Sequence, residues 1–234
     1  LVESSQKLGG LLATFPIAST QLEFFYHHFF NHDKEIFWML QELNLDSEVL
    51  FQETNMGMYL KGKLHPFSTA KDLLFFPHMG FMDKVRFGLS SLFLTHQNNW
   101  QQYENLPAVD WFYKWAGKKA TEAIWLPMLK IKFSEYFDSV PVSWMIGRLQ
   151  QRIKSRNQGK EKLGYLKGSL QRLTDSLEEE LIAMGVHIFK NSPVKSLIIE
   201  NDELVGVSTG SQILKATKFL ATLPTPYLSS LIPN

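Results

Sequence analysis

The chain has 234 residues, of which 44% are hydrophobic and 13% aromatic, including 18 Phe and 6 Trp; this is far more apolar surface than a disordered segment carries. Its 24 Lys and Arg residues nearly balance 23 Asp and Glu residues, so the composition argues against nucleic acid as a partner. The absence of Cys excludes disulfides, thiolate catalysis and Cys-ligated zinc.

The first regular elements are predicted between residues 33 and 69. In "DKEIFWMLQELNL" apolar residues recur at three and four positions, and Asp33 is placed to cap the first turn of a helix. In "VLFQETNMGMYLKGKLHPFST" short apolar pairs alternate with Asn-Met-Gly and Lys-Gly. This pattern predicts two or three short strands joined by turns, in a meander.

Residues 69 to 149 carry mostly helical patterns. Pro77, Pro107, Pro127 and Pro141 punctuate them, and each favours a helix boundary or first turn. We expect a helical subdomain of four to six short helices. The polar, Gly-containing stretch "SRNQGKEKLGYLKGS" that follows predicts a surface loop and an internal boundary.

A helix and a sheet are predicted at the end of the chain. "SLQRLTDSLEEELIAMG" repeats Leu at three and four positions and ends on Gly185, which is typical of an amphipathic helix with a C-terminal glycine. The next residues alternate with a period of two, interrupted by Asn-Asp and Thr-Gly-Ser. They predict a strand, a meander of three strands, and a last strand ending in "ATLP".

These pieces, in this order, resemble the superfamily of flavin-dependent amine oxidases, protoporphyrinogen oxidases and phytoene desaturases. The stretches that carry the resemblance are "VESSQKLGGLLAT", "LEFFYHHFF", "LGYLKGSLQRLTDSLEEELIAMGVHI", and "SPVKSLIIENDELVGV" with "KFLATLP". The resemblance implies an α+β fold: the substrate domain of an FAD-dependent amine-oxidase-like fold, with a helical subdomain, an antiparallel sheet, and incomplete pieces of a Rossmann-type cofactor domain at the ends.

The same resemblance implies three parts along the chain. Residues 1–20 would be a remnant of the FAD-binding domain, residues 21–160 the mostly helical substrate domain, and residues 161–234 a helix and β-meander leading back to the FAD-binding domain. The family's glycine-rich phosphate loop is not in this sequence, which would then be an internal piece of a longer flavoprotein. We therefore expect the chain alone to bind FAD weakly and to be inactive.

The resemblance also assigns cofactor contacts. Glu3 would bind the ribose hydroxyls of FAD, Gly9 and Gly10 would allow close approach of the backbone, and the backbone of Val194 would meet the adenine. Three further residues would lie close to the cofactor, Ala221, Leu223 and Pro224. The basic residue usual after the Gly-Gly pair is Leu11 here, so a charge contact to the cofactor phosphates is not expected from this position.

The "YHHFF" run supplies the candidates for a substrate pocket, Tyr26, His27 and His28. In a strand, Tyr26 and His28 would face one side and His27 the other, so only one imidazole would look into a pocket. There it could orient a substrate or shuttle a proton; the alternative is a histidine of the core or of a loop. With His32 the run has enough imidazoles for a metal, but no carboxylate has suitable spacing, and we expect no metal site.

Two further patterns leave alternatives open. "DWFYKWAGKKATEAIW" is either a core-facing aromatic stripe with solvated lysines, or a lining for an apolar substrate, or a membrane-surface contact. Arg148, Arg152 and Arg156 are spaced at i, i+4 and i+8 of a predicted helix. Such a stripe is either a solvated face or a place for an anionic substrate group.

We expect an FAD-dependent oxidoreductase that oxidises a C–N or C–C bond of an apolar or amphipathic small molecule by hydride transfer to flavin. The alternative is a non-catalytic, flavoprotein-derived module that binds a lipid or a protein. No Ser-His-Asp order, paired acids or phosphate loop supports a hydrolase or a phosphotransferase. No stretch approaches the roughly 20 apolar residues of a spanning helix, and we expect a cytoplasmic protein, with peripheral membrane contact left open.

Overall fold

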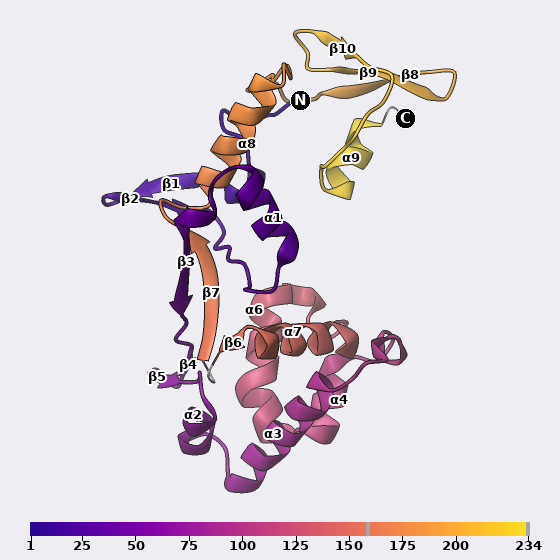
Figure 1. Cartoon of the computed structure of the whole chain (residues 1–234). Coiled ribbons are helices and arrows are strands. Elements are labelled where there is room, and N and C mark those ends of the chain that lie inside the picture. The colour runs from indigo at the N-terminus through magenta and orange to yellow at the C-terminus, as the bar shows by residue number, and fades with distance from the viewer. Residues whose placement is uncertain (158–159, 233–234) are drawn as a thin grey trace. The chain divides into compact units, whose positions relative to one another are not determined.

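The computed structural model describes residues 1–157 and 160–232, which form two compact units (Figure 1). The first unit contains Leu1–His27, Phe37–Val49 and Tyr165–Asn234; the second contains His28–Ile36 and Leu50–Gly164. Each unit is built from segments that are distant in the sequence. The division into the contiguous ranges 1–20, 21–160 and 161–234 stays a prediction about domains.

The first unit combines a long helix with two small antiparallel sheets (Figure 1). Its elements are the 3-10 turn η1 (Gly10–Leu12), β1 (Thr14–Ile17), β2 (Thr20–Glu23), most of α1 (Lys34–Glu42), the 3-10 turn η2 (Asp46–Glu48), α8 (Gln171–Ala183), β8 (Ser196–Glu200), β9 (Glu203–Ser208), β10 (Ile213–Lys215) and α9 (Thr225–Leu231). Strands β1 and β2 form a hairpin, and the other sheet has the order β10-β9-β8.

The C-terminal elements follow the predicted order in part: α8 and a meander of three strands are present, but the strand predicted between them is only an isolated β-bridge at Phe189. Helix α8 is followed by Gly185 at φ 80°, and Asn201 and Asp202, both at positive φ, make the turn between β8 and β9. The prediction of a last strand that ends in "ATLP" is wrong, because residues 216–224 form no helix or strand. No described strand pairs with this segment, and its Leu220 is 91% exposed.

The second unit is a helical bundle with short strands (Figure 1). Its elements are β3 (Val49–Glu53), β4 (Gly57–Leu60), β5 (Lys63–Pro66), α2 (Ala70–Phe75), α3 (Phe81–Thr95), η3 (Trp100–Tyr103), α4 (Ala108–Trp115), α5 (Lys118–Ala120), the π-helical turn η4 (Thr121–Trp125), α6 (Leu126–Phe133), η5 (Ser134–Tyr136), α7 (Val142–Lys154), β6 (Arg156–Asn157) and β7 (Lys160–Leu166). The first residue of β3 and the last two of β7 belong to the first unit.

Aromatic stacking forms the core of the second unit. The rings of Phe112 and Trp125 are stacked with centroids 4.2 Å apart, and Phe87 stacks on the same Trp125 ring at 5.1 Å. The prolines lie where the sequence predicts helix boundaries: Pro107 and Pro141 precede α4 and α7. These two residues also form a β-bridge, which places the starts of both helices side by side.

The strands of the second unit differ from the sequence prediction. Strands β4 and β5 form a hairpin, but β3 pairs with β7 instead of extending a single meander. The prediction of a loop over residues 155–169 is also wrong, because the strands β6 and β7 lie within it; residues 158–159 are outside the described residues. Gly164 of β7 exchanges two backbone hydrogen bonds with Phe29, whose ring stands edge-on to Phe51 of β3. The segment forms a strand because it pairs with residues that are distant in the chain, although its local pattern is polar and contains glycine.

Substitution of Gly164 by Ala is expected to destabilise the fold, because the new Cβ atom would collide with the ring of Phe29. We expect a loss of about 1–3 kcal/mol in the free energy of unfolding, measured by urea denaturation. The control is Gly147→Ala on α7, where no atom lies within 4 Å of the added Cβ, so the change should be neutral or stabilising by up to about 1 kcal/mol. Equal effects of both substitutions would contradict the packing argument.

Candidate functional site

The first candidate site begins at the end of an extended segment at the N-terminus. Val2 and Phe189 form a parallel β-bridge, and the backbone N–H of Glu3 donates to the carbonyl of Phe189 at 2.9 Å. The N–H of Ser192 in turn donates to the carbonyl of Glu3 at 2.9 Å. Glu3 therefore stands at the carboxyl end of two parallel segments, which is where ligands bind in open parallel sheets.

The carboxylate of Glu3 keeps part of its hydrogen-bonding capacity. Its Oε1 atom accepts the backbone N–H of Ser5 at 2.7 Å and the hydroxyl of Ser4 at 3.1 Å. Among the described residues, no hydrogen bond reaches Oε2. Because a carboxylate offers about four lone-pair sites, this half-buried group is held in place by one oxygen and presents the other as an acceptor.

The two glycines that follow differ in what surrounds them. A Cβ atom on Gly9 would come within 2.8 Å of the Thr174 side chain on α8, so this glycine permits close approach of the loop to the helix. Gly10, at φ 51°, has no atom within 4 Å of such a Cβ. Its backbone is thus open to close approach by another group, and both residues adopt left-handed conformations that favour glycine.

Of the remaining predicted cofactor contacts, Val194 lies near Glu3, whereas Ala221 and Pro224 have no hydrogen bond to it in the described part of the chain. Val194 is half-buried and follows Ser192, whose N–H is bonded to Glu3, so the structure brings the Val194 segment to the Glu3 strand end. Ala221 and Pro224 are exposed, and Pro224 precedes α9. No hydrogen bond between the described residues joins either of these two to Glu3, and the cofactor contacts all stay predictions.

A buried carboxylate that the sequence analysis missed holds this region together. Glu23 at the end of β2 is 3% exposed, and both of its oxygens accept the Tyr165 hydroxyl, at 2.6 and 2.7 Å. Oε1 also accepts the Leu170 N–H at 2.7 Å, just before α8. Burial and the neighbouring Glu23 carboxylate raise the pKa of Tyr165. No local signal reveals this, because the Glu and Tyr are 142 residues apart.

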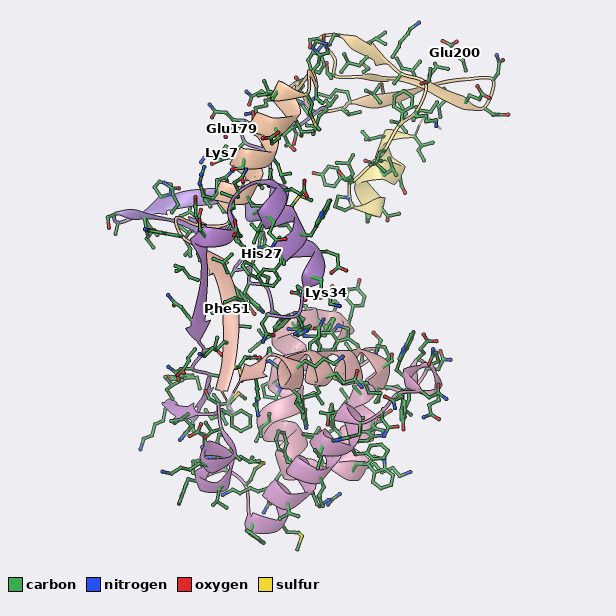
Figure 2. The ribbon with its side chains drawn as sticks, in the orientation of Figure 1. Lys7, His27, Lys34, Phe51, Glu179 and Glu200 are labelled. Atoms are coloured by element: carbon green, nitrogen blue, oxygen red, sulfur yellow. The ribbon has the colours of Figure 1, made fainter. Side chains whose placement is uncertain are left out.

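Removal of this carboxylate is expected to destabilise the first unit. Glu23→Ala leaves the Tyr165 hydroxyl and the Leu170 N–H without their acceptor, which should cost roughly 3 kcal/mol of unfolding free energy in urea. The control is Glu200→Ala, an exposed Glu at the end of β8 (Figure 2). If Glu23→Ala unfolded at the same urea concentration as this control, the network would have no stabilising role.

The candidate pocket residues lie outside regular structure. Residues 24–28 form no strand, so the predicted alternation of Tyr26 and His28 against His27 is wrong. Tyr26 is 81% exposed. The Nδ1 atom of His27 (Figure 2) donates a hydrogen bond to the Phe25 carbonyl at 2.6 Å. Their role in a substrate pocket stays a prediction. Within the described residues no three His, Asp or Glu side chains gather into a metal site.

His28, which belongs to the second unit, has the more distinctive environment. Its ring stands edge-on to Phe30 with centroids 5.2 Å apart. Burial is the main cause that lowers the pKa of His28; Arg148 and Arg152 lower this pKa further, whereas Glu161 and Asp33 raise it. The imidazole is therefore held neutral at pH 7.

The titration of His28 tests this environment. By NMR, we expect its imidazole to titrate below the value of about 6.5 found in short peptides. Because the folded state resists protonation, its contribution to stability is complete above pH 6.5 and decreases as the pH falls toward the lowered pKa. His28→Gln should remove this part of the acid-side loss of stability; an unchanged pH profile would contradict the assignment.

The second candidate site is a hollow of about 710 Å³ on the helical unit. It lies between α3, η3 and α4, and its lining residues are Arg86, Leu89, Ser90, Phe93, Tyr103, Trp111, Lys114 and Trp115. The aromatic helix predicted from the sequence is interrupted at Gly117, so Trp125 lies on η4 and not on α4. Trp111, Phe112 and Trp125 face the core, with at most 6% exposed, whereas Trp115 at the end of α4 is 53% exposed. One helix thus contributes to both the core and an open apolar surface.

The arginine pattern does not form a stripe on one helix. Helix α7 ends at Lys154, so Arg156 lies on β6. The guanidinium of Arg152 pairs with Glu161, its Nε atom 3.4 Å from Oε1, and that of Arg148 lies over the Trp144 ring at 5.9 Å. Within the chain, Arg152 thus pairs with a carboxylate and Arg148 with an aromatic ring, and a place for an anionic substrate group stays an alternative.

Comparison with known proteins identifies the family. All of residues 1–234 match the family described as flavin containing amine oxidoreductase. The chain belongs to this family. The resemblance stated from the sequence is therefore confirmed. No curated protein matches the chain in sequence, and within the described residues no helix is both long enough and apolar enough to cross a membrane.

Solved structures of this family share the fold. A putative protoporphyrinogen oxidase from Exiguobacterium sp. 255-15 matches with a TM-score of 0.71 and 17% identity, over 98% of this chain and 54% of that one. An oxidoreductase from Methanosarcina mazei matches with a TM-score of 0.65 and 17% identity, over 99% of this chain and 54% of that one.

Cyclohexylamine oxidase from Brevibacterium oxydans IH-35A matches with a TM-score of 0.63 and 10% identity, over 92% of this chain and 50% of that one. The chain thus spans about half the length of these structures. At such identities the likeness shows the fold, and it confirms the α+β, amine-oxidase-like architecture expected from the sequence.

Proposed function

We propose that the protein is an FAD-dependent oxidoreductase that oxidises a C–N or C–C bond of an apolar or amphipathic small molecule. A bound flavin would supply the chemistry by accepting a hydride. Membership of the flavin-containing family supports the class of reaction. The small-molecule partner, the exclusion of nucleic acid and a cytoplasmic location are parts of the same proposal and rest on composition.

The observation that carries the proposal is the half-satisfied carboxylate at the N-terminal strand end. Ser4 and Ser5 fix Oε1 of Glu3, while Oε2 presents free lone pairs that suit the two hydroxyls of a ribose. The open backbone of Gly10 and the Val194 segment lie in the same unit. These residues fit an adenine nucleotide: Glu3 would bind its ribose and the glycine would let the chain approach it closely.

We further propose that the 234-residue chain binds FAD weakly by itself and is inactive. The pyrophosphate of a dinucleotide normally lies against a glycine-rich loop and the N-terminus of a helix that follows the first strand of the fold. Within the described residues, Gly9 precedes a 3-10 turn of three residues, η1, which begins at Gly10, and not a helix of several turns. This turn offers few aligned N–H groups.

Replacement of Glu3 tests the cofactor role. In the protein expressed from its full reading frame, Glu3→Ala should weaken FAD binding about tenfold, since a hydrogen bond to a charged group contributes about 1.5–3 kcal/mol. The measurement is the flavin absorbance that stays with the protein after desalting, together with a titration by free FAD. Glu200→Ala, a matched exposed Glu on β8, is the control and should leave both unchanged.

A full-length protein that folds but never retains flavin would instead favour the second candidate, a non-catalytic module that binds a lipid or a protein. One observation supports that candidate specifically. The hollow on the helical unit presents apolar side chains to solvent: Leu89 is 62% exposed and Phe93 47%. The flavin content of the full-length protein separates the two candidates.

A further inference from the structure

The hollow between α3, η3 and α4 has the size and walls of a small-molecule site. Its volume of about 710 Å³ falls within the range of about 300–1,000 Å³ typical of ligand pockets. Leu89 and Phe93 on α3 line it together with Trp111 and Trp115 on α4, and the rings of Phe93 and Trp111 are stacked with centroids 6.2 Å apart. Because Trp115 is 53% exposed, a ligand lying here would bury apolar surface that the chain leaves in water.

The charges around the hollow are all of one sign. Among the described residues that line it, Arg86 and Lys114 are the only charged ones, and none carries a carboxylate. The acidic residues on these helices are Asp83 and Asp110: Asp83 lies 3.8 Å from Lys119, and neither residue lines the hollow. The wall of the hollow therefore carries a positive charge that no lining residue neutralises.

Arg86 is held in a defined orientation. Its Nε and Nη2 atoms donate to the carbonyls of Trp115, at 3.2 Å, and of Lys114, at 2.9 Å, at the end of α4. No hydrogen bond between described residues uses its Nη1 atom. The ammonium of Lys114 lies 5.3 Å from the centroid of the Trp115 ring. Two donors are thus placed at the edge of an aromatic surface.

We propose that this hollow binds a single-chain amphipathic anion, a long-chain carboxylate. Its alkyl chain would lie along Leu89, Phe93 and Trp115, and its carboxylate would accept hydrogen bonds from Nη1 of Arg86 and from Lys114. This role is independent of the flavin chemistry proposed above, because it rests only on residues of the second unit. A hollow with apolar walls alone would not select for charge; the two cations give it that selectivity.

The test uses three probes with the same alkyl chain and different head groups: laurate, dodecanol and dodecylammonium. Each is titrated as monomers into the 234-residue chain, and binding is followed by equilibrium dialysis. We expect laurate to bind saturably at one site and about tenfold or more tightly than dodecanol, with no measurable binding of dodecylammonium. Equal binding of laurate and dodecanol, or no saturable binding of laurate, would overturn the proposal.

Variants locate the site. Lys114→Gln should weaken laurate binding about tenfold. The control is Lys118→Gln, four positions further along the chain, which should not change binding because Lys118 does not line the hollow. Leu89→Gln alters an exposed wall residue and should abolish binding while urea unfolding is unchanged. If both lysine variants bind equally, the site is elsewhere.

A membrane surface is the competing occupant. Vesicles of anionic phosphatidylglycerol that retain the chain, with no binding of monomeric laurate, would overturn the proposal in favour of a peripheral membrane contact. Binding of monomeric laurate that is lost in Lys114→Gln and Leu89→Gln, but kept in Lys118→Gln, would support it.

Discussion

The buried carboxylate of Glu23 is the interaction on which the first unit depends. A charged group at 3% exposure is stable in a protein interior only if donors replace the water it loses, and here the Tyr165 hydroxyl and the Leu170 N–H do so. These contacts fix the end of β2 to the residues that begin α8. Helix α8 then packs Thr174 against Gly9 and leads through Gly185 to the segment that pairs with the N-terminal residues. Glu23 thus helps to position Gly9 and, through α8, the segment that pairs with the N-terminal residues.

The second unit is organised by aromatic rings instead of by a buried charge. Phe112 and Trp125 stack in its core, and the prolines before α4 and α7 set where its helices begin. Helix α4 serves two purposes because successive residues of a helix point in different directions. Phe112 completes the core, whereas Lys114 and Trp115 face the hollow.

The two units therefore offer different chemistry. The first presents a fixed carboxylate and an open glycine backbone, which suit the sugar of a nucleotide; the second presents aromatic and aliphatic surface with two cations, which suits an amphipathic anion. The match of residues 1–234 to a flavin-containing family agrees with a nucleotide-binding role for the first arrangement. The chain covers about half the length of the solved structures that share its fold.

From the sequence alone we could predict the family, the amphipathic helix that ends at Gly185, the β8-β9-β10 meander and the helix boundaries at prolines, because each follows from a local pattern. The sequence did not determine that residues 160–166 form a strand, that β3 pairs with β7, or that Arg156 leaves the helix of Arg152. Nor did it reveal the bond between Glu23 and Tyr165, or the hollow beside Trp115. Only tertiary structure decided these features, since the partners lie far apart in the chain and the free energy comes from burying them together.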